Sequence, residues 1–363
     1  MEGGIKGVYI IKNYHNNTHK QGQQHEYTHK VRLQHDPGAK YEPHWNNNMS
    51  DETIEHHTIA VKEMQYKGLR LVGYTRTRIK RAADATNIER FQSHYGVSPA
   101  VCCTIYEDLQ TTAVEEARIN NGSDTTLKWF LIALHFLRRY PTEDEREALF
   151  DVSKPYGAQK QWEFVEKIQA LKAEKIVWDD TFYDNEDDWV ISVDGTHCWI
   201  KEPGHPTWSQ DTKYYSHKYN KAGLNYELAI ALSTSRLVWM NGPYPAGSND
   251  ISVFCRKGLQ RKLQDLQKKA IGDAGYSGHP DTISAPNTMD SNGVKLFKSR
   301  ALKRHETFNG HTKVFDCLNG RFRHSVERFA NCFEAVCVLC QYQIEVDKPL
   351  FNILVEAVLE EEH

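Results

Sequence analysis

The spacing of apolar residues divides this chain into a helical region and a region that contains strands. From about residue 58 to 175, apolar side chains recur every three or four positions, which predicts amphipathic helices. The clearest series is Leu127, Phe130, Leu131, Leu134 and Leu137. From residue 189 onward, short apolar runs alternate with helical stretches, so we predict a mixed-sheet α/β domain covered by helices.

Polar residues mark where several of the predicted helices begin. Ser98-Pro99 predicts a helix start, with serine as the N-cap and proline in the first turn. A capping box begins at Thr142, and the next helix begins at Ser153. Two short helices joined by a tight turn resemble a helix-turn-helix, and a small helical bundle without DNA contact fits equally well. The second of these helices carries positive charge only at Lys154, Lys160, Lys167 and Lys172.

Four apolar runs predict the strands of the second region. The first, Trp189 to Ile200, is rich in β-branched residues, and Ala270-Ile271 forms a short later strand. Between them, Tyr226 to Leu232 pairs with Leu237 to Met240 as a hairpin across a Ser-Thr-Ser turn. This order, without a glycine-rich phosphate loop, suits an RNase H-like fold.

The remaining segments of this region are predicted to be helical or irregular. A single helix is expected from Asp250 to about Leu266, after the Ser-Asn-Asp cap. Residues 277–300 are rich in Gly, Pro and Ser and show little periodicity, so we expect an irregular insertion. The chain beyond them is predicted to be helical until about Tyr342.

The bulk composition narrows the class of protein. A chain of 363 residues predicts one to three domains. Its formal net charge of −3 gives no overall nucleic-acid signature, so any such contact must come from local patches. The eight cysteines lack the spacing of a small disulfide scaffold and are expected to be reduced. With no apolar run long enough to span a bilayer, we expect a soluble, intracellular protein.

The two ends of the chain differ from the rest. Residues 1–57 are dense in Asn and Gln and hold eight of the 18 histidines, so we expect a mostly disordered segment. These histidines lack a tight ligand spacing, which disfavours a metal site. Residues 346–363 are predicted to be a short acidic tail. Between the ends, we expect a helical domain over residues 58–180, an acidic linker, and the strand-containing domain over residues 189–345.

Three acidic residues carry the candidate chemistry. Asp194 and Asp273 each follow a short apolar run, as expected of carboxylates carried by strands. Glu327 borders the apolar stripe of a predicted helix. Two strand-borne aspartates and one helix-borne glutamate, in this order, are a ligand set of two-metal phosphoryl-transfer sites, which hold two divalent ions about 3.5–4 Å apart. Mg²⁺ prefers such oxygen ligands.

Each acidic residue also has a purely structural explanation. Asp194 and Asp273 both stand in turn-like sequences with a nearby glycine. On spacing alone, Glu327 is a solvated glutamate, and Glu334 on the same helix face competes with it for the role of ligand. Asp250 is a fourth acidic candidate whose N-cap position accounts for it without a metal.

Two further groups of residues have open interpretations. Cys337 and Cys340 have the spacing of a zinc knuckle or redox pair, but no second pair is present, so we expect buried thiols. A basic cluster could serve as a nuclear localisation signal, a phosphate-contact patch or a solvated helix face. It consists of Arg76, Arg78, Lys80 and Arg81.

Several short motifs together resemble a known family, the DDE-superfamily endonuclease domain of PIF/Harbinger-type (IS5-like) transposases. The principal ones are Val193–His197, Gly247–Asp250, Gly272–Tyr276 and Arg323–Phe329. Two supporting segments are Tyr214–Lys218 and Arg304–Asn309, the latter similar to the family's E-x-F-N segment. The resemblance covers about residues 127–345, with His324 standing where the family often has arginine and Ala330–Cys332 replacing an expected glycine.

The resemblance implies a metal-dependent endonuclease or transposase. Its RNase H-like domain would cleave and transfer DNA strands with Mg²⁺ or Mn²⁺, after a helix-turn-helix-like domain. The resemblance places the catalytic, metal-binding triad at Asp194, Asp273 and Glu327. It also places Arg323 and Arg328 where they would contact phosphate or orient the glutamate. Transposon ends and target DNA, a Myb-like DNA-binding partner, a homodimer and a nuclear location in a eukaryote, or a cytoplasmic one otherwise, are further implications.

Two other functions remain open at this point. One is a domesticated transposase relic that binds DNA or a protein without cleavage; such a relic is expected to lose a carboxylate, and here all three are present. The other is a different RNase H-like nuclease, for instance one in DNA repair.

Overall fold

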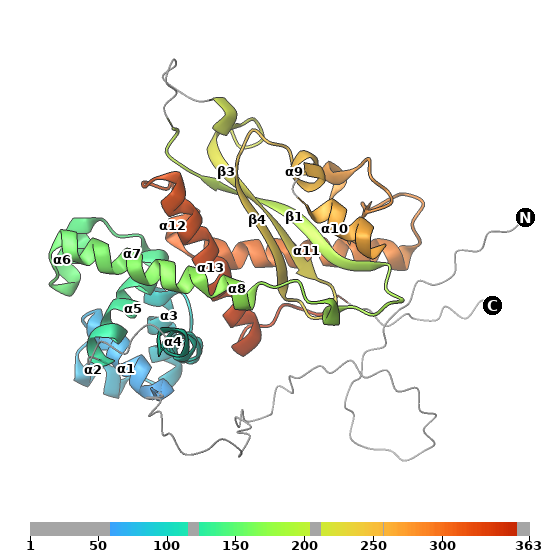
Figure 1. Cartoon of the computed structure of the whole chain (residues 1–363). Helices are drawn as coiled ribbons and strands as arrows, with labels where there is room; N and C mark the ends of the chain where they lie inside the picture. Colours follow the sequence, from blue (N-terminus) through green and yellow to red (C-terminus); the bar gives the residue numbers. More distant parts are fainter. Residues whose placement is uncertain (1–58, 115–122, 204–211, 257, 354–363) are drawn as a thin grey trace, which may run out of the picture.

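The computed structural model shows a helical region beside a mixed sheet (Figure 1). It describes residues 59–114, 123–203, 212–256 and 258–353, so the predicted disordered segment and the last ten residues lie outside the described part. The helical region comprises α1 (Val61–Leu71), α2 (Arg76–Arg81), α3 (Asp84–Tyr95), α4 (Pro99–Val114), α5 (Ser123–Arg139), α6 (Glu143–Phe150), α7 (Lys154–Ala170) and α8 (Lys172–Lys175).

The local capping signals are confirmed in this region. Helix α4 begins at Pro99, and the Ser98 hydroxyl accepts a hydrogen bond from the Val101 amide at 3.2 Å. Helix α6 has the full capping box, in which Thr142 and Glu145 satisfy each other's backbone amides. Helix α7 begins one residue after Ser153. These starts are encoded within four residues of sequence, which explains why they could be predicted.

Helix α7, the second helix of the predicted helix-turn-helix, is packed into the molecule. Its buried side chains include Phe164, Val165 and Ile168, and the helix packs against α5 and the C-terminal helix α13 (Val326–Val346). The small-bundle interpretation therefore describes this helix pair better than an exposed recognition helix.

The sheet combines an antiparallel and a parallel half. It contains β1 (Trp189–Trp199), β2 (Tyr215–Ser216), β3 (Lys221–Ala231), β4 (Leu237–Pro245), β5 (Lys269–Ile271) and β6 (Ile283–Ser284). Strands β1, β3 and β4 pair antiparallel, with the short β2 also on β3, and β5 and β6 extend the sheet parallel to β1. This strand order confirms the predicted mixed-sheet, RNase H-like fold, with β1 at the centre.

Five helices and three short 3₁₀ turns complete the strand-containing region. The helices are α9 (Asp250–Arg256), α10 (Leu259–Leu266), α11 (Asn292–Lys313), α12 (Asp316–Asn319) and α13. The turns are η1 (Asp180–Phe182), η2 (Thr212–Tyr214) and η3 (Ala274–Tyr276).

Two predictions for this region were wrong. The single helix expected from Asp250 to Leu266 is two helices, α9 and α10, because Gly258 adopts φ of 104°, which breaks a helix and suits glycine. The segment 277–300 is not irregular throughout, since it contains β6 and the start of α11. Ser291 caps α11, and the buried Val294 and Lys298 are spaced for a helix, although their mixed character hides the periodicity.

Helices cover both faces of the sheet. Because side chains alternate along a strand, Val193 and Ala229 face the core formed with α9 and α10, which includes Phe254. The other face, with Leu228, packs against α11 and α13, where Phe308 is buried. Candidate side chains on β1 are therefore held between two helical layers.

The helical region and the second face of the sheet share one hydrophobic core, so the predicted boundary near residues 180–189 does not separate two cores. The segment after α13, expected to be a tail, is partly packed as well, since Ile353 is buried against Leu232, Ile271 and Ala301. None of the helices in the described ranges is sufficiently long and apolar to cross a membrane.

Candidate functional site

The site is centred on two aspartates that adjacent strands place side by side. Strands β1 and β5 run parallel with Ser192 opposite Ile271. Continuing both chains by two residues brings Asp194 level with Asp273, just beyond the end of β5. Asp273 is among the charges that raise the pKa of Asp194, so the two residues lie within electrostatic reach of each other.

Asp194 is a largely desolvated carboxylate held by two neighbours. Its Oδ1 accepts a hydrogen bond from the Gly195 amide at 2.8 Å, and its Oδ2 lies 3.4 Å from the Asn309 amide nitrogen. The Thr196 hydroxyl donates to Asn309 and fixes the orientation of that amide. Burial raises the pKa of Asp194 to about 6, and the nearby charges of Asp250 and Asp273 add to the effect.

Asp250 belongs to the same cluster, although the sequence favoured a capping role over a place in the site. The capping hydrogen bond of α9 is made by Asn249, whose side chain accepts from the Ser252 amide at 3.2 Å. The Asp250 carboxylate instead lies against Gly195, where any larger side chain would collide with it. Burial and Asp273 raise the pKa of Asp250. We refer to Asp194, Asp250 and Asp273 as the acidic cluster.

Asp273 is the most accessible member of the acidic cluster. It caps η3, and its carboxylate accepts a hydrogen bond from the Gly275 amide at 2.8 Å. Lys218 is the cation whose charge lowers the pKa of both Asp194 and Asp250. Three carboxylates thus face one nearby lysine, and the excess negative charge favours binding of a cation.

A layer of buried polar groups lies next to the acidic cluster. Glu227 on β3 is only 3% exposed, and burial raises its pKa to about 7. Its Oε2 accepts a hydrogen bond from Trp239 Nε1 at 3.0 Å. Tyr276 is fully buried, and the charges of Asp250 and Glu227 help to raise its pKa. The sequence prediction missed Glu227 because it treated Tyr226 to Leu232 as an apolar run, although an ionisable residue there is itself a signal.

Glu327 shows no electrostatic interaction with the acidic cluster. It is exposed at the first turn of α13, and its own backbone amide and Ser325 lower its pKa. None of the three clustered aspartates contributes to that shift. The neighbouring Arg328 forms an ion pair with Glu166 of α7. The start of α13 is therefore occupied by contacts with the helical region.

Helix α11, rather than α13, runs beside Asp194. His305 Nε2 lies 2.9 Å from the Ser192 carbonyl oxygen, and Lys313 Nζ donates to the His197 carbonyl at 2.8 Å. Asn309, between them, reaches Asp194. Glu306 is exposed and precedes Asn309 by three residues, so both lie on the same side of the helix. Helix α11 thus carries a carboxylate about one turn from the residue that contacts Asp194.

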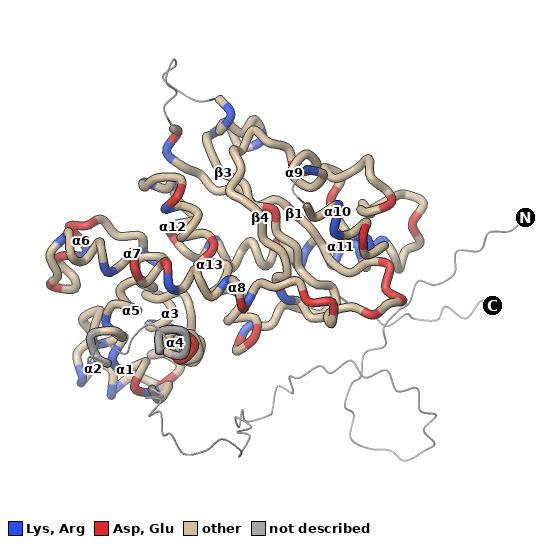
Figure 2. Tube along the Cα trace, in the orientation of Figure 1, with Lys and Arg blue, Asp and Glu red and all other residues tan. Residues whose placement is uncertain are grey.

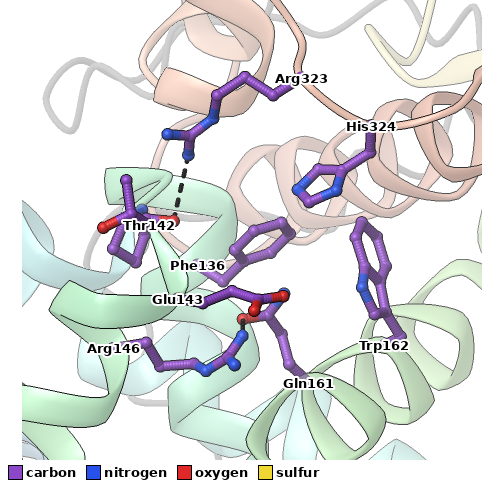
Figure 3. Close-up of a pocket in the computed structure, with 9 residues that line it drawn as sticks. Phe136, Thr142, Glu143, Arg146, Gln161, Trp162, Arg323 and His324 are labelled. Atoms are coloured by element: carbon purple, nitrogen blue, oxygen red, sulfur yellow. Dashed lines mark hydrogen bonds between the residues drawn. The ribbon is translucent and has the colours of Figure 1, made fainter. Parts of the chain in front are cut away.

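Arg323 and His324 line a pocket between the helical region and the segment that precedes α13 (Figure 3). Arg323 donates hydrogen bonds to the Tyr140 and Pro141 carbonyls at 2.6 and 3.1 Å. The His324 ring lies edge-on to Trp162, with ring centroids 5.1 Å apart. The side-chain partners that the structure gives for Arg323 and Arg328 therefore lie in the helical region, and these contacts stabilise the fold. Neither arginine orients Glu327.

The other candidates have structural roles. Glu334 is 8% exposed and accepts hydrogen bonds from Gln169 and Lys172, both at 2.6 Å, which accounts for its charge. Cys337 and Cys340 are fully buried, as expected of apolar packing. Within the described part of the chain, no group of three or more His, Cys, Asp or Glu side chains is arranged to hold a metal ion.

Comparison with known proteins supports the same region. Residues 193–341 match the family model described as DDE superfamily endonuclease, a span that includes the acidic cluster, Glu306 and Glu327 but less than half of the chain. No curated protein matches. A solved structure of a pre-cleavage Mos1 transpososome is similar at 10% sequence identity, with 77% of this chain and 96% of that chain covered. Its TM-score of 0.20 is too low to support any argument.

Proposed function

We propose that this chain is a metal-dependent DNA endonuclease of the transposase type. The observation that carries the proposal is the acidic cluster: strand-borne Asp194 and Asp273, with Asp250 beside them, on the central strands of an RNase H-like sheet. The match of residues 193–341 to a DDE superfamily endonuclease model supports it.

The chemistry of the cluster fits a divalent metal ion. All of its donors are carboxylate oxygens, which Mg²⁺ and Mn²⁺ prefer. Burial and mutual repulsion raise the pKa values of Asp194 and Asp250, so a bound cation would stabilise their ionised forms. The fit rests on this donor chemistry and charge and not on an assembled ligand set, since the described residues contain no group of three such side chains arranged around one metal position. When bound, the metal would supply Lewis acidity at phosphate and a more acidic water.

The chain's own residues have distinct roles in this proposal. Asp194 and Asp273 would hold the metal, and Asn309 would orient the Asp194 carboxylate from α11. Asp250 adds negative charge against Gly195. Lys218, at the edge of the cluster, is placed to neutralise a phosphate oxygen of the DNA.

For the third, helix-borne ligand we propose Glu306 instead of the predicted Glu327. Helix α11 contacts β1 at Ser192, Asp194 and His197, and Glu306 lies within that stretch of the helix. Glu327 lies at the start of α13, where the surrounding contacts join α13 to the helical region.

Further features of the proposal come from the family resemblance. We propose a PIF/Harbinger-type enzyme that cuts transposon ends, transfers them to target DNA as a homodimer, and works in the nucleus of a eukaryote. A Myb-like partner would supply site recognition, so the isolated chain should bind DNA weakly and in a salt-sensitive manner. A gel shift at low and moderate salt tests this, and tight sequence-specific binding by the chain alone would contradict it.

Cleavage of a labelled DNA duplex in Mg²⁺ or Mn²⁺ tests the proposal. We expect Asp194→Asn, Asp273→Asn and Glu306→Gln each to lose more than about 100-fold in rate, since losing even an outer-shell partner of a metal typically costs 10–100-fold. Glu327→Gln and the matched surface control Asp265→Asn should retain activity, because Asp265 is 71% exposed on α10.

The outcomes separate the competing hypotheses. Activity lost in Glu327→Gln but kept in Glu306→Gln would restore the ligand set predicted from the sequence. A well-folded wild-type chain that fails to cut, even with a Myb-like partner present, would instead support a domesticated binding protein.

A further inference from the structure

Two sets of cations in the helical region differ in how they are neutralised. Each lysine of the predicted helix-turn-helix has a carboxylate partner: Lys154 with Asp144, Lys160 and Lys167 with Glu163, and Lys172 with Glu334. The basic cluster of α2 is different. Arg76, Arg78, Lys80 and Arg81 are all exposed, and none takes part in an ion pair identified among the described residues.

A groove opens between α2 and α3 beside these cations. It has a volume of about 410 Å³ and is lined by Thr75, Thr77, Arg78, Arg81, Ala82 and Arg90. Its described lining therefore contains three guanidinium groups and two hydroxyls but no carboxylate. Figure 2 shows Lys and Arg gathered at α2. We refer to this feature as the α2–α3 groove.

Two of the arginines in the α2–α3 groove are held in place by one aromatic ring. The guanidinium carbons of Arg78 and Arg90 lie 4.9 and 5.4 Å from the ring centroid of Tyr74. Arg90 also donates to Asn87 Oδ1 at 3.2 Å. Two positive charges kept near one ring repel each other, and this repulsion is relieved when a polyanion binds.

The fold orients α2 so that its charges point outward. Ile79 is 7% exposed and anchors the helix, and Asn87 of α3 donates to the Ile79 carbonyl at 2.9 Å. The nearby acidic residue Asp84 is engaged on its other side, where it pairs with Lys62 and accepts a hydrogen bond from Gln65. The positive charge of the groove is therefore available to bind an external ligand.

We infer that the α2–α3 groove binds the phosphate backbone of duplex DNA. Arginine forks and threonine hydroxyls are suited to phosphate oxygens, and such contacts position DNA without reading its sequence. The choice of DNA among polyanions rests on the proposed function. The inference places the DNA contact of the helical region at α2 and α3, where the sequence allowed a phosphate-contact patch, and not at α6 and α7, whose sequence resembles a helix-turn-helix.

Fluorescence anisotropy with a labelled duplex of random sequence, in EDTA and over a range of salt concentrations, tests the inference on the full chain. We expect the double variant Arg78→Gln/Arg81→Gln to bind about tenfold more weakly at moderate salt. The slope of log affinity against log salt should fall by about two, because each lost phosphate contact releases about one counterion fewer. Tyr74→Leu, which keeps every charge but removes the ring under the two arginines, should weaken binding by a smaller factor.

A double variant with the same loss of charge elsewhere is the control. Arg261→Gln/Lys348→Gln changes one cation on α10 and one exposed cation after α13, and it should bind as the wild type does. Equal losses in both double variants, or no loss in Arg78→Gln/Arg81→Gln, would overturn the inference. Binding to an RNA duplex or to anionic vesicles that is tighter than binding to the DNA duplex, and that depends on the same arginines, would also overturn the inference.

The binding assay without metal and the cleavage assay separate the two proposals. A wild-type chain that cuts DNA, together with groove variants that bind normally, would refute the groove alone. Binding that depends on the groove in a chain that never cuts would refute the nuclease and leave the groove intact.

Discussion

The acidic cluster and the contact between α7 and α13 contain similar residues but treat their charges in opposite ways. Between α7 and α13, Glu166 pairs with Arg328, and Glu334 accepts hydrogen bonds from Lys172 and Gln169. In the acidic cluster, three aspartates gather around one lysine, and their repulsion and burial raise pKa values. Charges that the fold neutralises hold the fold together, whereas charges that it concentrates indicate a ligand supplied from outside.

Removing one charge from the acidic cluster is the strongest test of whether its charges are concentrated for a ligand. Without metal, Asp194→Asn should raise the free energy of unfolding at pH 8 by about 2 kcal/mol, because a carboxylate with a raised pKa destabilises the fold where it is ionised. Wild-type protein should gain thermal stability when Mn²⁺ is added, and the variant should lose that gain. Thermal melts with and without Mn²⁺ measure both effects. A variant less stable than wild type, with an unchanged response to Mn²⁺, would make the cluster structural.

The matched change in the other region should have the opposite sign. Glu334→Ala leaves Lys172 without its partner beside a nearly buried position, so we expect a loss of about 3 kcal/mol in the free energy of unfolding. Urea denaturation measures this loss. The response to Mn²⁺ should stay as in wild type, and its disappearance in a folded variant would assign Glu334 to the metal site after all.

The pH dependence of the free energy of unfolding tests the comparison at Glu227. Its pKa in the folded chain is about 7, above its usual value of 4.5, so the folded state favours the protonated form. Its contribution to stability is complete below about pH 4.5 and is lost as pH rises through 7. Relative to Glu227→Gln, wild type should therefore lose about 2–3 kcal/mol of stability between pH 4.5 and 7. Urea denaturation of both proteins at several pH values checks this, and a constant difference would show that Glu227 ionises normally.

The smallest expected effect concerns the exposed ion pair at the start of α13. Arg328→Gln should cost less than about 1 kcal/mol, because both partners are more than a third exposed and solvent screens their attraction. DNA cleavage by this variant should match wild type. A large loss of cleavage without a loss of stability would return Arg328 to the phosphate-contact role that the family resemblance suggested.

The sequence by itself determined the local elements and two residues of the candidate site. The helix starts at Ser98, Thr142 and Ser153 depend on a few neighbouring residues. The lengths and the apolar character of the strand segments predict β1 and the β3–β4 hairpin. Asp194 and Asp273 could be predicted because each directly follows an apolar strand, where a carboxylate is costly unless it has a function.

Tertiary structure decided which helices serve the site and which surfaces remain free. The packing of α11 on β1, through His305 and Asn309, brings Asn309 to Asp194 and Glu306 to within about one turn of that contact. Carboxylates on α6, α7 and α13 pair with the lysines of the predicted DNA-binding helix, whereas the arginines and the lysine of α2 stay exposed. Periodicity and capping depend on neighbours within one or two turns. Helix-to-sheet packing depends on residues more than a hundred positions apart, which no local pattern encodes.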